Sequence, residues 1–343
     1  MTFTNTRNRP MKRMVSFDLA RDLSIIGVVM AHYQAIGIQP TWIYLTSQAF
    51  HTFRQALFMF ASGYIYIMTK KDMPYKAYIQ KKIKRLVVPY IAISIILITL
   101  KVLTGGKGCN EEIVTPMSYI KMLYQPEAGV FLWFIYALWW MYTIVPFFKT
   151  PKARLILFVF TFIMQNAPVS LPSALCLKEV QHFFFYFMLG VVCYDWKSLS
   201  SWIHKFPAFI TYILFALCDT IILTNTYRGD FIYYITALTG IAASMSFAHS
   251  LEEPYKNSKE WIRNLGKSRY TIYLFHSLFM AIARAFVIKM PFLAEPMNIP
   301  SYAIIVSSGI IGPILLHKYV LCKTPVTRAL FGLKNPQHTI PPL

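Results

Sequence analysis

Charged residues are scarce in this sequence, and acidic residues are scarcer still. Asp, Glu, Lys and Arg make up 14% of the 343 residues, whereas soluble domains contain about a quarter. This shortage excludes an ordinary soluble globular fold. The hydrophobic share of 56% and a mean hydropathy of +0.46 indicate instead a protein that crosses a membrane several times.

The shortage of acid leaves a net charge of +20, from 34 basic and 14 acidic residues. In a soluble protein that excess would suggest a nucleic-acid partner. Here the basic residues lie in short loops between apolar runs, and the sequence contains no long basic domain. We therefore expect no nucleic-acid partner and interpret the charge as a marker of membrane orientation.

Cysteine is also rare. The five cysteines form no C-x-x-C pair and no His/Cys set with zinc spacing, so we predict no metal site. Cys109 and Cys176 fall in loops expected outside the membrane, where oxidation is permitted, and we expect them to be able to approach each other. A cleavable signal peptide is not indicated, because charges at 18–22 interrupt the first apolar run and no A-x-A site follows.

Long apolar segments are what the sequence has in plenty, and each is near the length that a membrane helix needs. We predict an all-α, polytopic membrane protein with about ten transmembrane helices. The whole chain, 1–343, is expected to be one module, with a cytoplasmic N-terminal segment (1–15), a ten-helix membrane domain (16–320) and a cytoplasmic tail (321–343). The ten segments are 16–38, 48–68, 86–103, 129–148, 153–168, 180–195, 207–225, 231–250, 268–288 and 299–320.

The distribution of Lys and Arg supports this number of segments. Counting from the N-terminus, alternate loops and their adjoining helix ends hold 25 basic residues, and the opposite loops hold 6. Basic residues concentrate on the cytoplasmic side of membrane proteins. The distribution therefore predicts that both termini are cytoplasmic.

The first apolar segment contains two ionisable residues at a helical spacing, Arg21 and His32. Eleven positions come within about 20° of three full turns, so the two side chains share a helix face about 16 Å apart along the axis, with Asp18 within about 60° of it. Arg21 either snorkels or pairs with Asp18 or Asp22, or it stands at the entrance of a polar path. His32 either bonds a neighbouring helix or removes a proton from a hydroxyl.

The stretch with both residues, SFDLARDLSIIGVVMAHY (16–33), resembles the first span of the acyltransferase 3 family of integral membrane O-acyltransferases. The mark of that span is Arg or Lys, ten residues, then His, which Arg21 and His32 match. Further resemblances follow in the expected order along the whole chain. They are FRQALFMFASGYIY (53–66), KKIKRLVVPY (81–90), LWFIYALWWMY (132–142) and SRYTIYLFHSLF (268–279).

One departure from the family pattern lies in the second span. Members of similar length often read His-Met-Pro-Leu-Phe before the Ser-Gly pair, whereas this chain has Arg54, Gln55 and Ala56 there. A proline kink is lost and a permanent charge is gained. This departure weakens the transfer of the family's fine acceptor specificity to this chain.

The resemblance implies O-acetyl transfer from cytoplasmic acyl-CoA to a sugar hydroxyl of an envelope or extracellular polysaccharide. Acetyl-CoA would be a substrate, with no permanently bound cofactor. The partners would be a polysaccharide or lipid-linked glycan and polysaccharide biosynthesis proteins, in a bacterial plasma membrane. Arg21, Lys84 and Arg85 would bind the phosphates of the donor. His32 would act as general base or carry the acyl group, and the sequence leaves both roles open.

Other residues have weaker claims to a role. Ser62 is either a nucleophile or a small residue at a helix contact, and Trp133 either stacks on a sugar or belongs to an aromatic belt. Arg54 binds either substrate or an acid on another helix. His276 is either a second acid/base or a hydrogen-bonding core residue, and the other histidines receive no role. A glycan exporter or flippase is the rival function, although its usual paired repeats are not found. A structural partner of a polysaccharide synthase would leave Arg21 and His32 unexplained.

Overall fold

The computed structural model describes residues 15–33, 40–105, 114–196, 208–224, 230–256, 260–290, 292 and 299–333. Within these ranges the chain forms helices and no β-strand. The predicted all-α class is therefore confirmed. Cys109 lies outside the described residues, so its approach to Cys176 stays a prediction; Cys176 itself is a buried free thiol.

Every predicted apolar segment overlaps a helix, because a chain in lipid must satisfy its backbone hydrogen bonds internally and a helix does so. These helices are α1 (Val15–Ala31), α2 (Thr41–Met68), α4 (Val88–Leu103), α6 (Trp133–Ile144), α7 (Pro151–Gln165), α8 (Leu177–Asp195), α10 (Ala208–Leu223), α11 (Asp230–Ser250), α13 (Glu260–Ile288) and α14 (Ile299–Leu316). Short helices join them: α3 (Tyr75–Lys82), α5 (Ser118–Lys121), α12 (Glu252–Lys256) and α15 (Pro325–Leu330).

The number of candidate spans is smaller than the predicted ten. Within the described residues, six helices are long and apolar enough to cross a membrane. They cover Tyr75–Leu103, Val130–Phe147, Ala174–Asp195, Phe231–Ser250, Leu265–Ile288 and Ile299–Leu321. The difference has local causes: α7 and α10 have 15 and 16 residues, and α1 has 17 with three charges. Helix α2 is long but interrupted by polar residues, including His51 and Arg54.

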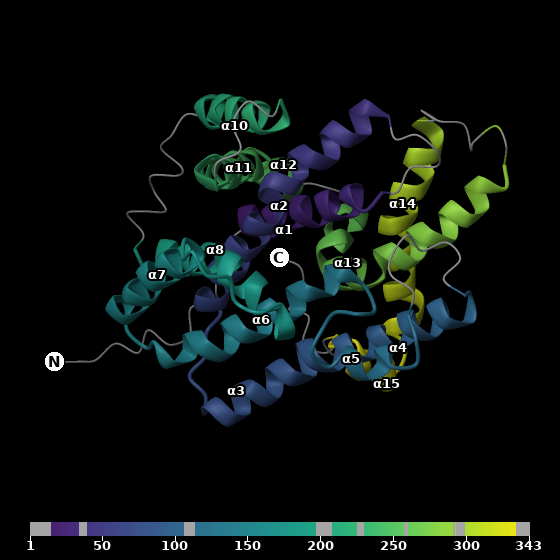
Figure 1. The fold of residues 1–343 in the computed structure, drawn as a ribbon, viewed down its shortest axis with the longest axis horizontal. Coiled ribbons are helices and arrows are strands. Elements are labelled where there is room, and N and C mark those ends of the chain that lie inside the picture. The colour runs from purple at the N-terminus through teal and green to yellow at the C-terminus, as the bar shows by residue number, and fades with distance from the viewer. Residues whose placement is uncertain are drawn as a thin grey trace.

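Helix α2 lies at the centre of the molecule and packs against α1, α8 and α11 (Figure 1). Its crossing with α8 is unusually close. A Cβ on Gly63 would lie 1.9 Å from the carbonyl oxygen of Phe187, and one on Gly190 would lie 2.0 Å from that of Phe60. The two backbones thus approach through reciprocal glycines, as small residues allow in membrane helices. On the other side of α1, α13 and α14 form a second closely packed pair.

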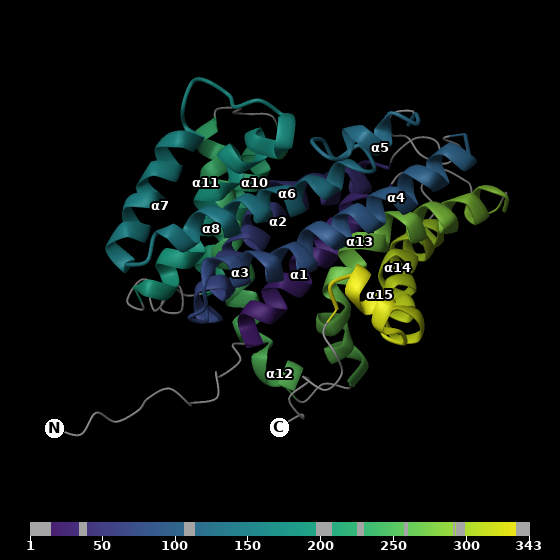
Figure 2. The same ribbon diagram turned by 90° about the horizontal axis from the view of Figure 1, so that it is seen from below.

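Several segments from the predicted cytoplasmic loops gather on one side of the molecule. Figure 2 shows α12 and α15 on the lower side of that view, where the backbone N–H of Ser16 in α1 donates to Glu252 in α12 at 3.2 Å. The chain after α15 returns to the basic segment, since a Cβ on Gly332 would lie 3.1 Å from the backbone of Arg85. The start of α1 therefore lies beside α12. The residues after α15 lie beside the basic 81–85 stretch.

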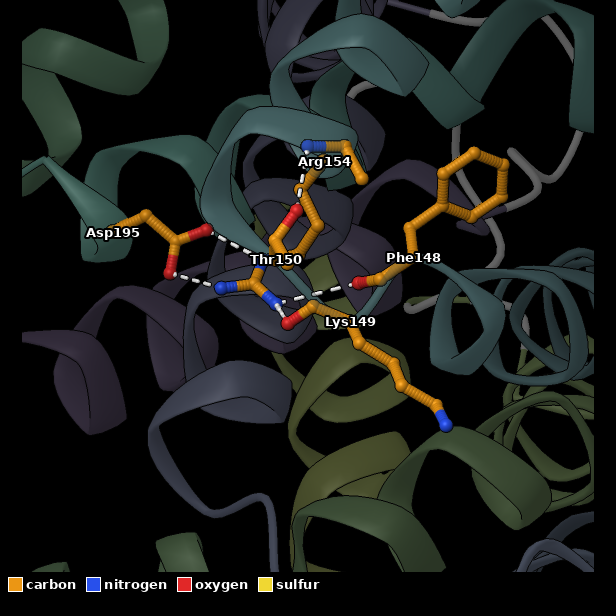
Figure 3. Close-up of polar contacts among 6 residues, drawn as sticks. Phe148, Lys149, Thr150, Arg154 and Asp195 are labelled. Atoms are coloured by element: carbon orange, nitrogen blue, oxygen red, sulfur yellow. Dashed lines mark hydrogen bonds and ion pairs between the residues drawn. The ribbon is translucent and has the colours of Figure 1, made fainter.

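A buried ion pair joins the start of α7 to the end of α8 (Figure 3). Arg154 Nε and Nη2 donate to the two carboxylate oxygens of Asp195 at 2.6 and 2.7 Å. Its Nη1 donates to the carbonyl oxygens of Lys149 at 2.7 Å and Phe148 at 3.3 Å. All three guanidinium nitrogens are therefore hydrogen-bonded, and a charge that would be expensive to bury alone is compensated.

Candidate active site

A cavity of about 180 Å³ lies between α1, α2, α13 and the segment that leads into α6. Phe, Trp and Tyr supply five of its eleven lining residues, and its most polar side chains follow the end of α1 or lie on α2. This is the composition expected of a small-molecule site, apolar walls with a few convergent polar groups. The lining residues are Val28, His32, His51, Arg54, Gln55, Phe58, Val130, Phe131, Trp133, Phe134 and Tyr273.

His32 lies at the end of α1 and lines this cavity. Its Nδ1 lies 2.7 Å from the carbonyl oxygen of Val28, one turn earlier in the same helix. A carbonyl oxygen accepts hydrogen bonds and cannot donate them, so Nδ1 carries the proton. The neutral ring then has its lone pair on Nε2. The helix end therefore selects the tautomer in which Nε2 can act as a base or a nucleophile.

His276, from α13, packs against His32. The two ring centroids are 4.9 Å apart at an interplanar angle of 73°. His276 Nδ1 donates to the carbonyl oxygens of Ile272 and Tyr273 at 3.1 and 2.9 Å. Its Nε2 is buried and has no hydrogen-bond partner in the described part of the chain. The Phe131 ring covers both imidazoles, with centroid distances of 5.9 Å to His32 and 4.9 Å to His276.

Arg54 projects from α2 into the same cavity. The residue is 5% exposed, and its Nε and Nη1 are buried without a hydrogen-bond partner among the described residues. An ion pair with an acid on another helix was one of its two predicted roles, and the described residues include no such pair for Arg54. Of the two predicted roles of Arg54, substrate binding is therefore the one to test.

Arg21 contacts the cavity wall from outside and does not line this cavity. Its guanidinium carbon lies 5.6 Å from the ring centroid of Phe58, whose side chain is part of the lining. Its buried Nε has no hydrogen-bond partner in the described part of the chain. Arg21 and His32 thus share a helix face, but the predicted continuous cavity between them is not seen in this lining, because Phe58 lies between Arg21 and the space beside His32.

The acids of α1 are occupied by an arginine that the sequence analysis did not single out. Arg269 in α13 donates from Nε to Asp22 at 2.7 Å and from Nη2 to the carbonyl oxygen of Asp18 at 2.9 Å, with the Asp18 carboxylate 3.5 Å from Nη1. Asp18 and Asp22 therefore hold α1 against α13. Arg21 also lies close enough to both acids for their charges to interact, so the predicted pairing of Arg21 with Asp18 or Asp22 stays open.

The basic segment 81–85 contains one lysine that packs on an aromatic ring and further cations that are exposed to solvent. Lys82 Nζ lies 3.3 Å from the ring centroid of Tyr142, a cation–π contact, so its charge is already engaged. Lys84 and Arg85 are exposed. Arg85 lies close enough to Arg21 for their charges to interact. The structure thus places Arg21 and Arg85 in one region, at the opposite end of α1 from His32.

Two other predicted residues have clear positions. Trp133 lines the cavity and stacks on Phe183, with ring centroids 4.9 Å apart at 23°. Ser62 is buried at the α2–α8 crossing beside Gly63 and is not part of the cavity lining.

Sequence reasoning missed several neighbours of His32. His51 lines the cavity although it received no predicted role, and its position three residues before Arg54 on α2 is a signal that helical periodicity carries. Phe131, Tyr273 and Arg269 could not have been found in this way. Their contacts with α1 or the cavity cross more than 90 positions of sequence.

The site therefore combines an imidazole protonated at Nδ1, a second buried imidazole, an arginine and aromatic side chains. Such a set suits proton transfer and the stabilisation of negative charge. Within the described residues, no group of three or more His, Cys, Asp or Glu side chains could hold a metal ion.

Comparison with known proteins agrees with the sequence resemblance. A family model described as an acyltransferase domain, that of the acyltransferase 3 family, matches residues 14–318. No curated protein and no solved structure matches the chain. The family match covers α1 to α14 and includes every residue of the cavity. The chain therefore belongs to the acyltransferase 3 family of membrane acyltransferases.

Proposed function

We propose that this protein moves an acetyl or other short acyl group from cytoplasmic acyl-CoA to a sugar hydroxyl of an envelope or extracellular polysaccharide. The observation that carries the proposal is the state of His32. Its Nδ1 proton is held by the Val28 carbonyl oxygen, so the lone pair of the neutral ring is on Nε2, and the residue lines the cavity. An imidazole in this state can accept the proton of a hydroxyl near neutral pH.

In the proposed reaction, the sugar hydroxyl oxygen attacks the thioester carbonyl carbon while His32 Nε2 accepts the hydroxyl proton. The tetrahedral intermediate then collapses, the carbon–sulfur bond breaks, and the proton returns to the leaving coenzyme A thiolate. The products are the sugar ester and free coenzyme A, so atoms and charge balance. His276 and the Phe131 ring hold the His32 imidazole in place and keep water from the thioester.

The donor is proposed to bind from the end of α1 that carries Arg21. Coenzyme A has phosphates, which suit the exposed Lys84 and Arg85 and the guanidinium of Arg21. The distribution of basic residues supports a cytoplasmic position for that end and for both termini. The thin pantetheine arm would then carry the thioester past Phe58 to His32. A bacterial plasma membrane is the proposed location, with a polysaccharide or lipid-linked glycan as acceptor.

The test is transfer of labelled acetyl groups from acetyl-CoA to glycan by the purified protein in lipid vesicles. His32→Ala and His32→Gln should lower the rate by about 10²- to 10⁴-fold, the usual contribution of a general base, with unchanged protein abundance. His182→Ala is the matched control, because it removes an exposed imidazole of α8 that is not in the cavity lining. Near-normal ester formation by His32→Ala would remove His32 from the mechanism.

A further inference from the structure

We propose that the acceptor is acidic, and that Arg54 binds a carboxylate or phosphate group on it. This inference rests on the proposed function and adds the chemical class of the acceptor. Its basis is the contrast between the burial of Arg54 and its missing partners. The residue is 5% exposed and lines the cavity, yet Nε and Nη1 have no hydrogen-bond partner among the described residues.

A buried guanidinium without a counter-charge is costly, because nothing compensates the loss of its hydration. Among the described residues, three arginines are buried: Arg54, Arg154 and Arg269. Arg154 is paired with Asp195, and Arg269 with Asp18 and Asp22. Within the described ranges the fold therefore supplies an aspartate to the other two arginines and none to Arg54. A negative charge supplied by a ligand would complete the pattern.

One buried acid, Asp219, packs against the same helix as Arg54 but on another face. Asp219 of α10 is buried against α2, where it accepts a hydrogen bond from Thr52 Oγ1 at 3.0 Å. Thr52 precedes Arg54 by two residues, which places the two side chains about 200° apart around the helix. Asp219 thus packs on a different face of α2 from the one that Arg54 presents to the cavity.

The cavity suits part of a sugar better than part of the donor nucleotide. Its volume of about 180 Å³ is below the 300 Å³ or so at which pockets for drug-sized ligands begin. It cannot hold both the thioester beside His32 and the coenzyme A phosphates beside Arg54, because the pantetheine arm separates those groups. His51, Gln55 and Trp133 complete the lining near Arg54 with hydrogen-bonding groups and an aromatic face. One charged sugar unit matches this set.

Arg54 also marks a difference within the family pattern described above, where a histidine often stands at this position. An arginine is charged at every physiological pH and forms forked hydrogen bonds with carboxylate and phosphate, which an imidazole does not. The substitution thus supplies a permanent anion-binding group within the lining that holds His32.

The first experiment measures ligand-induced thermal stabilisation of the purified protein, without any acyl donor. The probes are glucose, glucuronate and glucose 6-phosphate at equal ionic strength. We expect at least one anionic probe to raise the melting temperature more than glucose does, and the carboxylate and phosphate arms identify which anion is preferred. The difference should vanish in Arg54→Gln, shrink in Arg54→Lys and persist in Arg284→Gln. Arg284 is the matched control, a half-buried arginine of α13 that is not in the cavity lining.

The second experiment measures acetyl transfer to a uronic-acid oligosaccharide and to its carboxyl-reduced counterpart. Wild type should prefer the acidic acceptor by at least about 10-fold in kcat/KM, the value of one additional charged contact of this kind. Arg54→Gln should raise KM for the acidic acceptor more than for the neutral one, so that the preference for the acidic acceptor is lost. A lipid-linked sugar phosphate extends the same comparison to phosphate.

Three results would overturn the inference. Equal stabilisation of wild type by neutral and anionic sugars would mean that Arg54 selects no anion. An equal fall in kcat for both acceptors in Arg54→Gln would assign Arg54 to the transition state instead of the acceptor. If Arg54→Gln does not fold, the comparison of anionic with neutral probes in wild type and in Arg54→Lys still tests the inference. Absence of transfer to any acceptor by wild type would refute the proposed function, whereas transfer without acidic preference would refute this inference alone.

Discussion

Arg154 and Arg54 are two buried arginines with opposite surroundings. Arg154 is 6% exposed and Arg54 is 5% exposed, so both guanidinium groups are removed from solvent to a similar degree. Arg154 donates from all three nitrogens to Asp195 and to two carbonyl oxygens (Figure 3). Arg54 has two buried nitrogens without a partner among the described residues. Burial alone therefore does not distinguish a structural arginine from a binding one; the partners do.

A similar contrast separates Arg269 from Arg21. Arg269 is paired with the two aspartates of α1 and ties that helix to α13. Arg21, three residues from Asp18 on the same helix, retains a buried Nε with no hydrogen-bond partner in the described part of the chain. Arg269 therefore holds two helices together, and we expect Arg21 to bind a ligand.

The largest effect is expected at the paired arginine. Arg154→Met leaves the Asp195 carboxylate buried without its cation, and the loss of one partner of such a pair typically costs about 3–5 kcal/mol of unfolding free energy. Chemical denaturation in a single detergent measures the loss. The double variant Arg154→Met with Asp195→Leu should recover most of it, because no isolated charge remains. A loss below about 1 kcal/mol in the single variant would show that the pair is not structural.

An intermediate effect is expected at Arg21, on the donor and not on stability. Arg21→Ala should raise the KM for acetyl-CoA by about 10-fold, equivalent to one charge-assisted contact of about 1.4 kcal/mol, and Arg21→Lys should raise it less. Steady-state kinetics with varied donor and fixed acceptor provide the measurement. A fall confined to kcat, with unchanged donor KM, would contradict a donor-binding role.

The smallest effect is expected for the stability of the Arg54→Met variant. Arg54 Nε and Nη1 have no hydrogen bond among the described residues, so the substitution removes none there. Burying an apolar side chain also costs less free energy than burying a guanidinium. The unfolding free energy should therefore change by less than about 1 kcal/mol or increase. The same denaturation series gives the value. A loss as large as that of Arg154→Met would reveal an internal partner and remove the contrast between the two arginines.

Much of the helical framework was predictable because a hydrophobic run is a local property. Ten predicted segments coincide with helices, although six helices of the described residues satisfy the length and hydropathy expected of a membrane span. The shortfall falls on helices that carry the chemistry, such as α1 and α2, or that are short, such as α7 and α10. Polar residues needed in a site lower the same hydropathy that identifies a span.

The site was predictable only in its local part. The spacing on α1 identified Arg21 and His32, family resemblance added His276 and Trp133, and a departure from the family pattern drew attention to Arg54. The partners could not be read in this way. Arg269 lies 247 positions from Asp22, and no pattern within either helix indicates that they meet.

The sequence by itself determined where the helices lie, which face of α1 carries Arg21 and His32, and the family to which the chain belongs. All three depend on order and spacing along the chain. The tertiary structure decided which charges are neutralised, because an ion pair depends on a separation of a few ångströms between atoms of different helices. The packing of α13 on α1 gave Asp18 and Asp22 to Arg269, and the packing of α8 on α7 gave Asp195 to Arg154. That same packing left Arg54 facing the cavity beside His32.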